Sequence, residues 1–198
     1  AAARAPETRD TDFKRQDCAE KGNGELIGTV GNLIHRVLSF IYTRMGGVIP
    51  EPGELDERDR EMLNLRLEYA RRLEELIEAC EFRKGLRTIL EFAQEGNAYM
   101  NEKAPWKNRE RAGSTLYVLA QVVFSLAVIS APYLPFTAQR ILDYMNIGKK
   151  VSELRWSDVA KEIPPGHRIK EPKPLFRKIT SEEVRKKLEK LKKLRSGG

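Results

Sequence analysis

Apolar residues recur at three- and four-residue spacing along most of this chain, which is the period of an α-helix. The clearest such patterns cover roughly residues 23–45, 63–77, 86–100 and 114–132, and a shorter one follows within 136–148. No segment shows the alternation of apolar and polar residues, bounded by turns, that would predict a half-buried strand. The sequence therefore predicts an all-α protein, built as an antiparallel helix bundle.

The fourth predicted helix is unusual because residues 112–139 include no charged side chain. A membrane span is one interpretation, but Gln121, Ser125 and Ser130 interrupt the apolar run. A span needs about 20 predominantly apolar residues, and only about 16 precede Pro132. We expect instead a central helix that amphipathic neighbours cover, in a chain that makes no contact with a membrane.

The last part of the chain differs in composition from the rest. Residues 163–179 include four prolines and a glycine, so we expect an extended segment that lies over the rest of the fold. A helical pattern returns from Thr180, and from residue 161 onward 13 lysines and arginines stand against 5 acidic residues. Such a basic tail can attract phosphate backbones or act as a solvated linker, and both interpretations stay open.

Cys18 and Cys80 are far apart, and neither belongs to a C-x-x-C pair, which gives no support to a disulfide or a zinc site. Two cysteines without a disulfide pattern fit a reducing, cytoplasmic location best. The chain begins without a methionine and without a secretory signal pattern, so we expect a piece of a longer protein. We expect a first segment (1–13), a helical domain (14–160), an extended proline-rich segment (161–179) and a basic helical tail or linker (180–198).

No arrangement of residues in the sequence is typical of an active site. His35 and His167 stand alone, without the H-x-x-x-H or C-x-x-C neighbours that a metal site needs. The sequence has no glycine-rich phosphate loop and no G-x-S-x-G motif. We therefore predict no catalytic residues, no metal ligands and no cofactor in this chain, and we expect it to bind a partner.

The segment "NAYMNEKAPWKN" combines several features of a binding surface. Asn97 falls on the apolar face of the third helix, where its amide needs hydrogen-bond partners. Pro105 ends that helix, and Trp106 follows it between Lys103 and Lys107. An indole among cations suits the stacking of single-stranded nucleic acid. Alternatively, Trp106 fills the end of the core, and the chain is a helical module for protein interaction or scaffolding without RNA specificity.

Five segments resemble, in the same order, parts of the methionyl-tRNA synthetases, a family of class I aminoacyl-tRNA synthetases. "NAYMNEKAPWKN" is similar to their N-x-Y and P-W signature, and "GELIGTVGNLIHRVLSF" to the helix that opens their anticodon-binding domain. "PETRDTDF" resembles the stretch after the catalytic domain in archaeal and eukaryotic-type members, and "SAPYLPFTAQRI" and "GHRIKEPKPLFRKI" resemble later segments of the helical domain. Together these segments cover nearly all of residues 5–179.

This resemblance implies a helical domain that recognises the CAU anticodon of methionine tRNA. In the family, a separate Rossmann-type catalytic domain activates methionine with ATP and Mg, esterifies it to the tRNA, and carries a zinc-bearing insertion. No counterpart of that domain occurs here, so residues 1–13 are expected to lead from it. The resemblance thus implies a part of a methionine–tRNA ligase, inactive alone, whose partners are the anticodon loop of methionine tRNA and its own catalytic domain.

The resemblance also implies roles for individual residues. Trp106 would stack on an anticodon base, with Pro105 holding its orientation, and Arg36, in a G-N-x-x-x-R sequence, would contact the anticodon. Several family members place an asparagine eleven residues before this arginine, where this chain has Glu25. Eleven residues are about three helical turns, so Glu25 and Arg36 share a helix face. The Glu25 carboxylate can accept a hydrogen bond from the cytosine amino group or pair with a nearby arginine, and both interpretations stay open.

Overall fold

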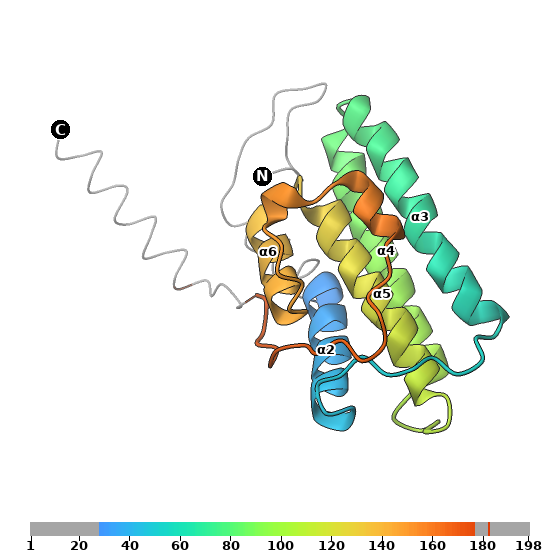
Figure 1. The fold of residues 1–198 in the computed structure, drawn as a ribbon. Coiled ribbons are helices and arrows are strands. Elements are labelled where there is room, and N and C mark those ends of the chain that lie inside the picture. Colours follow the sequence, from blue (N-terminus) through green and yellow to red (C-terminus); the bar gives the residue numbers. More distant parts are fainter. Residues whose placement is uncertain (1–27, 177–181, 183–198) are drawn as a thin grey trace.

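A computed structural model describes residues 28–176 and Glu182. The predicted linker (1–13), Glu25 and, apart from Glu182, the predicted tail (180–198) lie outside the described residues. The described part forms a bundle of α-helices followed by two short 3-10 helices, and the all-α prediction is confirmed (Figure 1). The elements are α2 (Asn32–Arg44), α3 (Glu57–Glu78), α4 (Phe82–Lys103), α5 (Ala112–Ser130), α6 (Pro135–Tyr144), η3 (Val151–Glu153) and η4 (Trp156–Ala160).

Helix α5 forms the centre of the bundle. All of its residues except Gly113 are buried, and α2, α3, α4 and α6 all pack against it. Among the described helices, α5 alone is long and apolar enough to cross a membrane, yet 94% of its apolar stretch is buried inside the fold. The predicted central helix is therefore confirmed, and its neighbours supply the cover that an uncharged helix needs.

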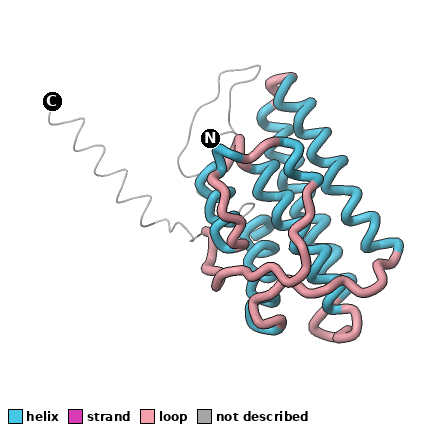
Figure 2. Tube along the Cα trace, in the orientation of Figure 1, coloured by secondary structure: helices cyan, strands magenta, loops and turns pink. Residues whose placement is uncertain are grey.

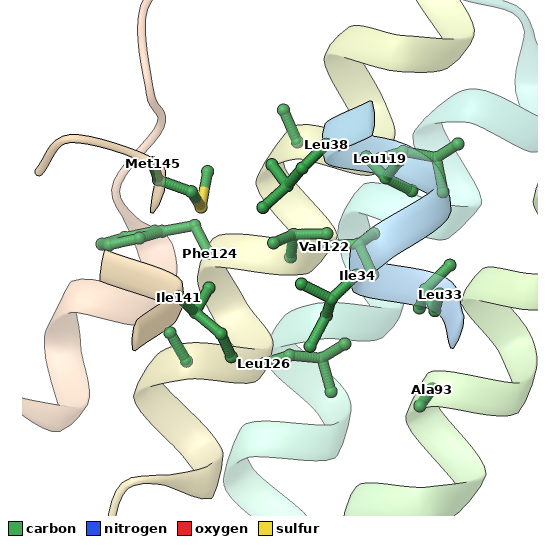
Figure 3. Close-up of a cluster of buried hydrophobic side chains, with 14 of the residues drawn as sticks. Leu33, Ile34, Leu38, Ala93, Leu119, Val122, Phe124, Leu126, Ile141 and Met145 are labelled. Atoms are coloured by element: carbon green, nitrogen blue, oxygen red, sulfur yellow. The ribbon is translucent and has the colours of Figure 1, made fainter. Parts of the chain in front are cut away.

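The apolar stripe of α2 packs into this core. Ile34 and Leu38 lie toward Val122 of α5 in Figure 3, and each of these side chains is at most 1% exposed. On the other side, Phe124 lies between Ile141 of α6 and Met145 (Figure 3). Each large apolar side chain buried in this way contributes about 1.5–3 kcal/mol relative to its exposed state.

The chain after η4 crosses the outside of the helices as a loop, which Figure 2 shows in pink. Its backbone pairs with the loop after α2: Ile49 N donates to His167 O at 2.9 Å, and Ile169 N donates to Gly47 O at 2.9 Å. Ile169 and Leu175 are buried against the bundle. The chain therefore follows the outside of the bundle as far as residue 176, where the description stops, and the predicted segment 161–179 as a separate unit stays a prediction.

Gln121 of α5 explains how this segment docks on an otherwise apolar helix. Its side chain is fully buried, and its amide meets the backbone of Ile163 twice. Gln121 Nε2 donates to Ile163 O at 3.0 Å, and Ile163 N donates to Gln121 Oε1 at 2.8 Å. A single side chain thus satisfies both backbone groups at the point where the segment enters the core.

Replacing Gln121 by leucine should lower the free energy of unfolding, because the buried N–H and C=O of Ile163 would lose their partners. We expect a loss of about 1–3 kcal/mol for each group left unpaired. The same change at Gln94, which is exposed on α4, should alter stability by less than about 0.5 kcal/mol. Urea unfolding of both variants makes this comparison, and equal stabilities would contradict the docking role of Gln121.

Asp158 fixes the short helix η4. Its side chain is 1% exposed, its Oδ2 accepts from the backbone N–H of Arg155 at 2.9 Å, and Lys161 Nζ lies 2.6 Å from its Oδ1. Burial by itself would raise the pKa of this carboxyl. The backbone hydrogen bond and the ammonium groups of Lys161 and Lys149 outweigh burial and lower the pKa of Asp158 to about 2.

A pH dependence of stability follows from this shift. The Asp158 carboxyl is more acidic in the folded chain than at its ordinary pKa of 3.8, so protonation favours the unfolded chain. The stabilisation is complete above about pH 4 and is lost as the pH falls through about 2. At neutral pH the free energy of unfolding should therefore be higher for the parent chain than for Asp158→Asn. This difference should shrink as the pH falls from about 4 to about 2. A difference that stays constant with pH would show that the carboxylate is not responsible.

Candidate nucleic-acid interface

The corner between α4 and α5 presents the residues that the sequence singled out. Helix α4 ends at Lys103, and Ala104 takes a left-handed conformation with φ 40° and ψ 62°. A proline disfavours the helical conformation in the residue before it, so Pro105 ends the helix by acting on Ala104. The carbonyl oxygen of Ala104 accepts from the N–H groups of Lys107 and Asn108 at 2.8 and 3.0 Å, which closes the turn.

Trp106 is exposed at this corner, whereas Pro105 is buried. Trp106 is 44% exposed, whereas Trp156, the second tryptophan of the chain, packs against the core. Trp106 therefore does not fill the end of the core, as the alternative interpretation of the sequence would require. It leaves an aromatic surface exposed at the corner.

Arg36 of α2 lies over this aromatic surface. Its guanidinium carbon is 5.6 Å from the centroid of the Trp106 ring, within the range of a cation–π interaction. Its Nη2 donates to Asn101 Oδ1 at 2.9 Å, and its Nη1 to Asn97 Oδ1 at 3.5 Å. The structure thus brings Arg36 and Trp106 together although they lie on different elements, and two asparagines of α4 fix the guanidinium.

Asn97 finds the partners that its position on an apolar face required, so that prediction is confirmed. Its Nδ2 donates to Thr29 O at 3.1 Å and to Ala93 O at 3.0 Å, while its Oδ1 accepts from Arg36. The amide therefore links the turn before α2 to α4 and orients Arg36. Any direct contact between Asn97 and a ligand remains a prediction.

The two lysines of this segment have different surroundings. Lys107 is exposed on the corner. The Lys103 side chain is largely buried, with 11% exposed. Its Nζ lies 2.6 Å from Asp56 Oδ2 and 2.8 Å from Asp59 Oδ1. A phosphate would have to compete with two carboxylates for this ammonium group, so we leave Lys103 out of the proposed contact surface.

Sequence reasoning missed Asn101 and Arg111. Asn101 follows Asn97 by one helical turn, a spacing that places both on one face of α4 and could have indicated a shared partner. Arg111, immediately before α5, reaches Asp59 Oδ2 at 2.8 Å. No local pattern signals that pair, because the two residues are 52 positions apart in the chain.

The sequence profile described as "Anticodon binding domain of methionyl tRNA ligase" matches residues 49–196 of this chain. The methionine–tRNA ligase of Thermococcus onnurineus is 39% identical over 90% of this chain and 24% of its own length. That of Pyrobaculum calidifontis is 38% identical over 96% of this chain and 34% of its own length. The chain thus spans about a quarter to a third of the curated relatives it matches.

Solved structures have the same fold. The apo form of methionyl-tRNA synthetase from Mycobacterium tuberculosis gives a TM-score of 0.79 at 24% identity, over 87% of this chain and 36% of that one. The same enzyme bound by methionyl-adenylate gives 0.76 at 25% identity, over 83% of this chain and 34% of that one. The profile match and the identity to the curated relatives show that this chain belongs to the family of anticodon-binding domains of methionyl-tRNA ligases.

Proposed function

We propose that the α4–α5 corner binds the anticodon loop of methionine tRNA, and that Trp106 stacks on one of its bases. The observation that carries this proposal is an exposed indole held at a helix exit, with a guanidinium 5.6 Å from its ring. Proteins that read single-stranded RNA stack unpaired bases on aromatic side chains and bind base edges with polar ones. The corner supplies both kinds of group within one small surface.

Arg36 can supply hydrogen bonds beside the stacked base. A guanidinium has five N–H donors, and the bonds to Asn97 and Asn101 use two of them. The remaining donors can reach a base edge or a phosphate close to the indole. Because both asparagines restrict the guanidinium before RNA arrives, less conformational entropy is lost on binding. We include in this proposal that the corner recognises the anticodon triplet CAU.

We further propose that the parent protein is a methionine–tRNA ligase that uses ATP to attach methionine to its tRNA in the cytoplasm. The relatives that cover this chain carry the name methionine–tRNA ligase, and one solved relative holds methionyl-adenylate. In this proposal the helical domain selects the tRNA by its anticodon. Another domain of the same protein catalyses the reaction, binds ATP with Mg, and holds any zinc. Alone, this chain would bind tRNA without charging it.

Truncation of Trp106 tests the proposal directly. Trp106→Ala should weaken binding of a methionine anticodon stem-loop by about 1–3 kcal/mol, the scale of one base–aromatic stack. The exposed position predicts a much smaller effect on unfolding than the about 3–5 kcal/mol expected for a buried tryptophan. Affinity by fluorescence anisotropy and stability by urea unfolding are measured on the same variant.

A matched control lies at the other end of the same helix. Phe82 begins α4 and is 39% exposed, close to the exposure of Trp106. Phe82→Ala should leave RNA affinity unchanged, and a stem-loop with a different anticodon should bind the parent chain more weakly. Equal affinity of Trp106→Ala and the parent chain would show that the indole does not contact the RNA. Equal affinity of the parent chain for the two stem-loops would contradict the proposed recognition of CAU.

A further inference from the structure

A cluster of charged residues around one buried carboxylate lies next to the α4–α5 corner. Its centre is Asp59, in the first turn of α3, whose side chain is 1% exposed. Asp59 Oδ1 accepts from the Tyr99 hydroxyl at 2.7 Å and lies 2.8 Å from Lys103 Nζ. Its Oδ2 lies 2.8 Å from Arg111 Nη2. Three side chains from α4 and the corner thus meet on one carboxylate of α3.

Asp56 provides the second carboxylate and the same two cations contact it. Its Oδ2 lies 2.6 Å from Lys103 Nζ and 3.0 Å from Arg111 Nη2. Asp56 and Asp59 also cap α3 reciprocally: each backbone N–H donates to the other side chain at 3.0 Å. Because these carboxylates belong to the N-cap and the first turn of a long helix, they form a fixed anchor for both cations.

The two cations stand at the two ends of the corner. Lys103 is the last residue of α4, and Arg111 immediately precedes α5, so every residue from 104 to 110 lies between them. In Figure 1 the corner is the yellow-green loop at one end of the bundle, and α3 begins near the same end. The cluster therefore ties both ends of the loop that presents Trp106 to α3.

Within the corner, Pro105 is buried and the carbonyl oxygen of Ala104 accepts two turn hydrogen bonds. Residues 106–110 are all exposed, so their side chains, that of Trp106 included, bury little surface of their own. By contrast, the cluster is costly to disturb, since removing one member of a buried ion pair leaves an uncompensated charge. Burial would raise the pKa of Asp59, but hydrogen bonds from Lys103 and Tyr99 outweigh it and lower the pKa, so the anchor is charged at neutral pH.

We propose that Asp59 is a positioning residue for RNA binding: through Lys103 and Arg111 it fixes the 104–110 loop and thereby holds Trp106 where a base can stack. This inference rests on the proposed function of Trp106. It explains why Lys103, which the sequence suggested as a phosphate contact, is directed to carboxylates instead. A loop ordered before binding spares the entropy of ordering it in the complex.

The test is a double-mutant cycle between Asp59 and Trp106. Asp59→Asn keeps the shape of the side chain and removes its charge. In the parent background it should weaken binding of the methionine anticodon stem-loop by about 3- to 10-fold, the cost of ordering a side chain that was fixed before. In the Trp106→Ala background the same change should have almost no effect, because the side chain to be positioned is gone.

Asp158→Asn is the matched control. Asp158 is also 1% exposed in its side chain, caps a short helix and binds two lysines, but it belongs to η4, away from the corner. It should lower stability without changing RNA affinity in either background. Arg111→Gln enters the same cycle as a second variant, in case Asp59→Asn fails to fold. The Arg111 side chain is 36% exposed, and its replacement leaves the ion pair between Lys103 and Asp59 in place, so this variant should be less destabilising.

The outcomes separate this inference from the proposed function. Weakening by Asp59→Asn, or by Arg111→Gln, that disappears in the Trp106→Ala background supports positioning. Equal weakening in both backgrounds, or weakening by Asp158→Asn to the same extent, would mean that loss of stability alone is responsible and would overturn it. If Trp106→Ala weakens binding while Asp59→Asn and Arg111→Gln do not, the positioning role fails alone. If Trp106→Ala itself has no effect, both proposals fail.

Discussion

A helix without charged residues must be enclosed on every side, and α5 imposes this requirement on the rest of the bundle. The neighbouring helices direct apolar faces toward it, and the segment after η4 docks on it through Gln121, a fully buried polar side chain. Because α4 and α5 are both long and pack side by side, the chain between them has to turn at the end of the bundle, outside the core. The burial of α5 thus determines where an exposed corner arises.

At that corner, local backbone chemistry turns a helix end into the surface that we propose binds RNA. Pro105 forces Ala104 out of the helical region, and the left-handed conformation of Ala104 is one that residues other than glycine adopt at a cost of about 1–3 kcal/mol. Such strain clusters at functional sites, where the surrounding structure maintains it. Here the buried Pro105 and the turn hydrogen bonds to Ala104 O hold the exit, and Trp106 is left exposed beside Arg36.

Much of this arrangement could be predicted because it depends on local sequence. Helical periodicity located the five α-helices between residues 28 and 176, the missing charges marked the central one, and the polar position of Asn97 on an apolar face indicated that it needs partners. The surroundings of Lys103 could not be predicted, because Asp56 and Asp59 lie more than 40 positions earlier and only packing brings them together. For the same reason no local pattern indicated that Arg111 pairs with Asp59. Glu25 and, apart from Glu182, the basic tail lie outside the described residues.

The central claim, that the indole of Trp106 stacks on an RNA base, is tested most directly by the fluorescence of that indole. The chain has two tryptophans, so Trp156→Phe leaves Trp106 as the only strong emitter. Titration with a methionine anticodon stem-loop should quench its emission, with a midpoint equal to the dissociation constant measured by anisotropy of the labelled RNA. Full RNA binding with unchanged Trp106 emission would contradict the account, because a stacked base cannot leave the indole surroundings unaltered.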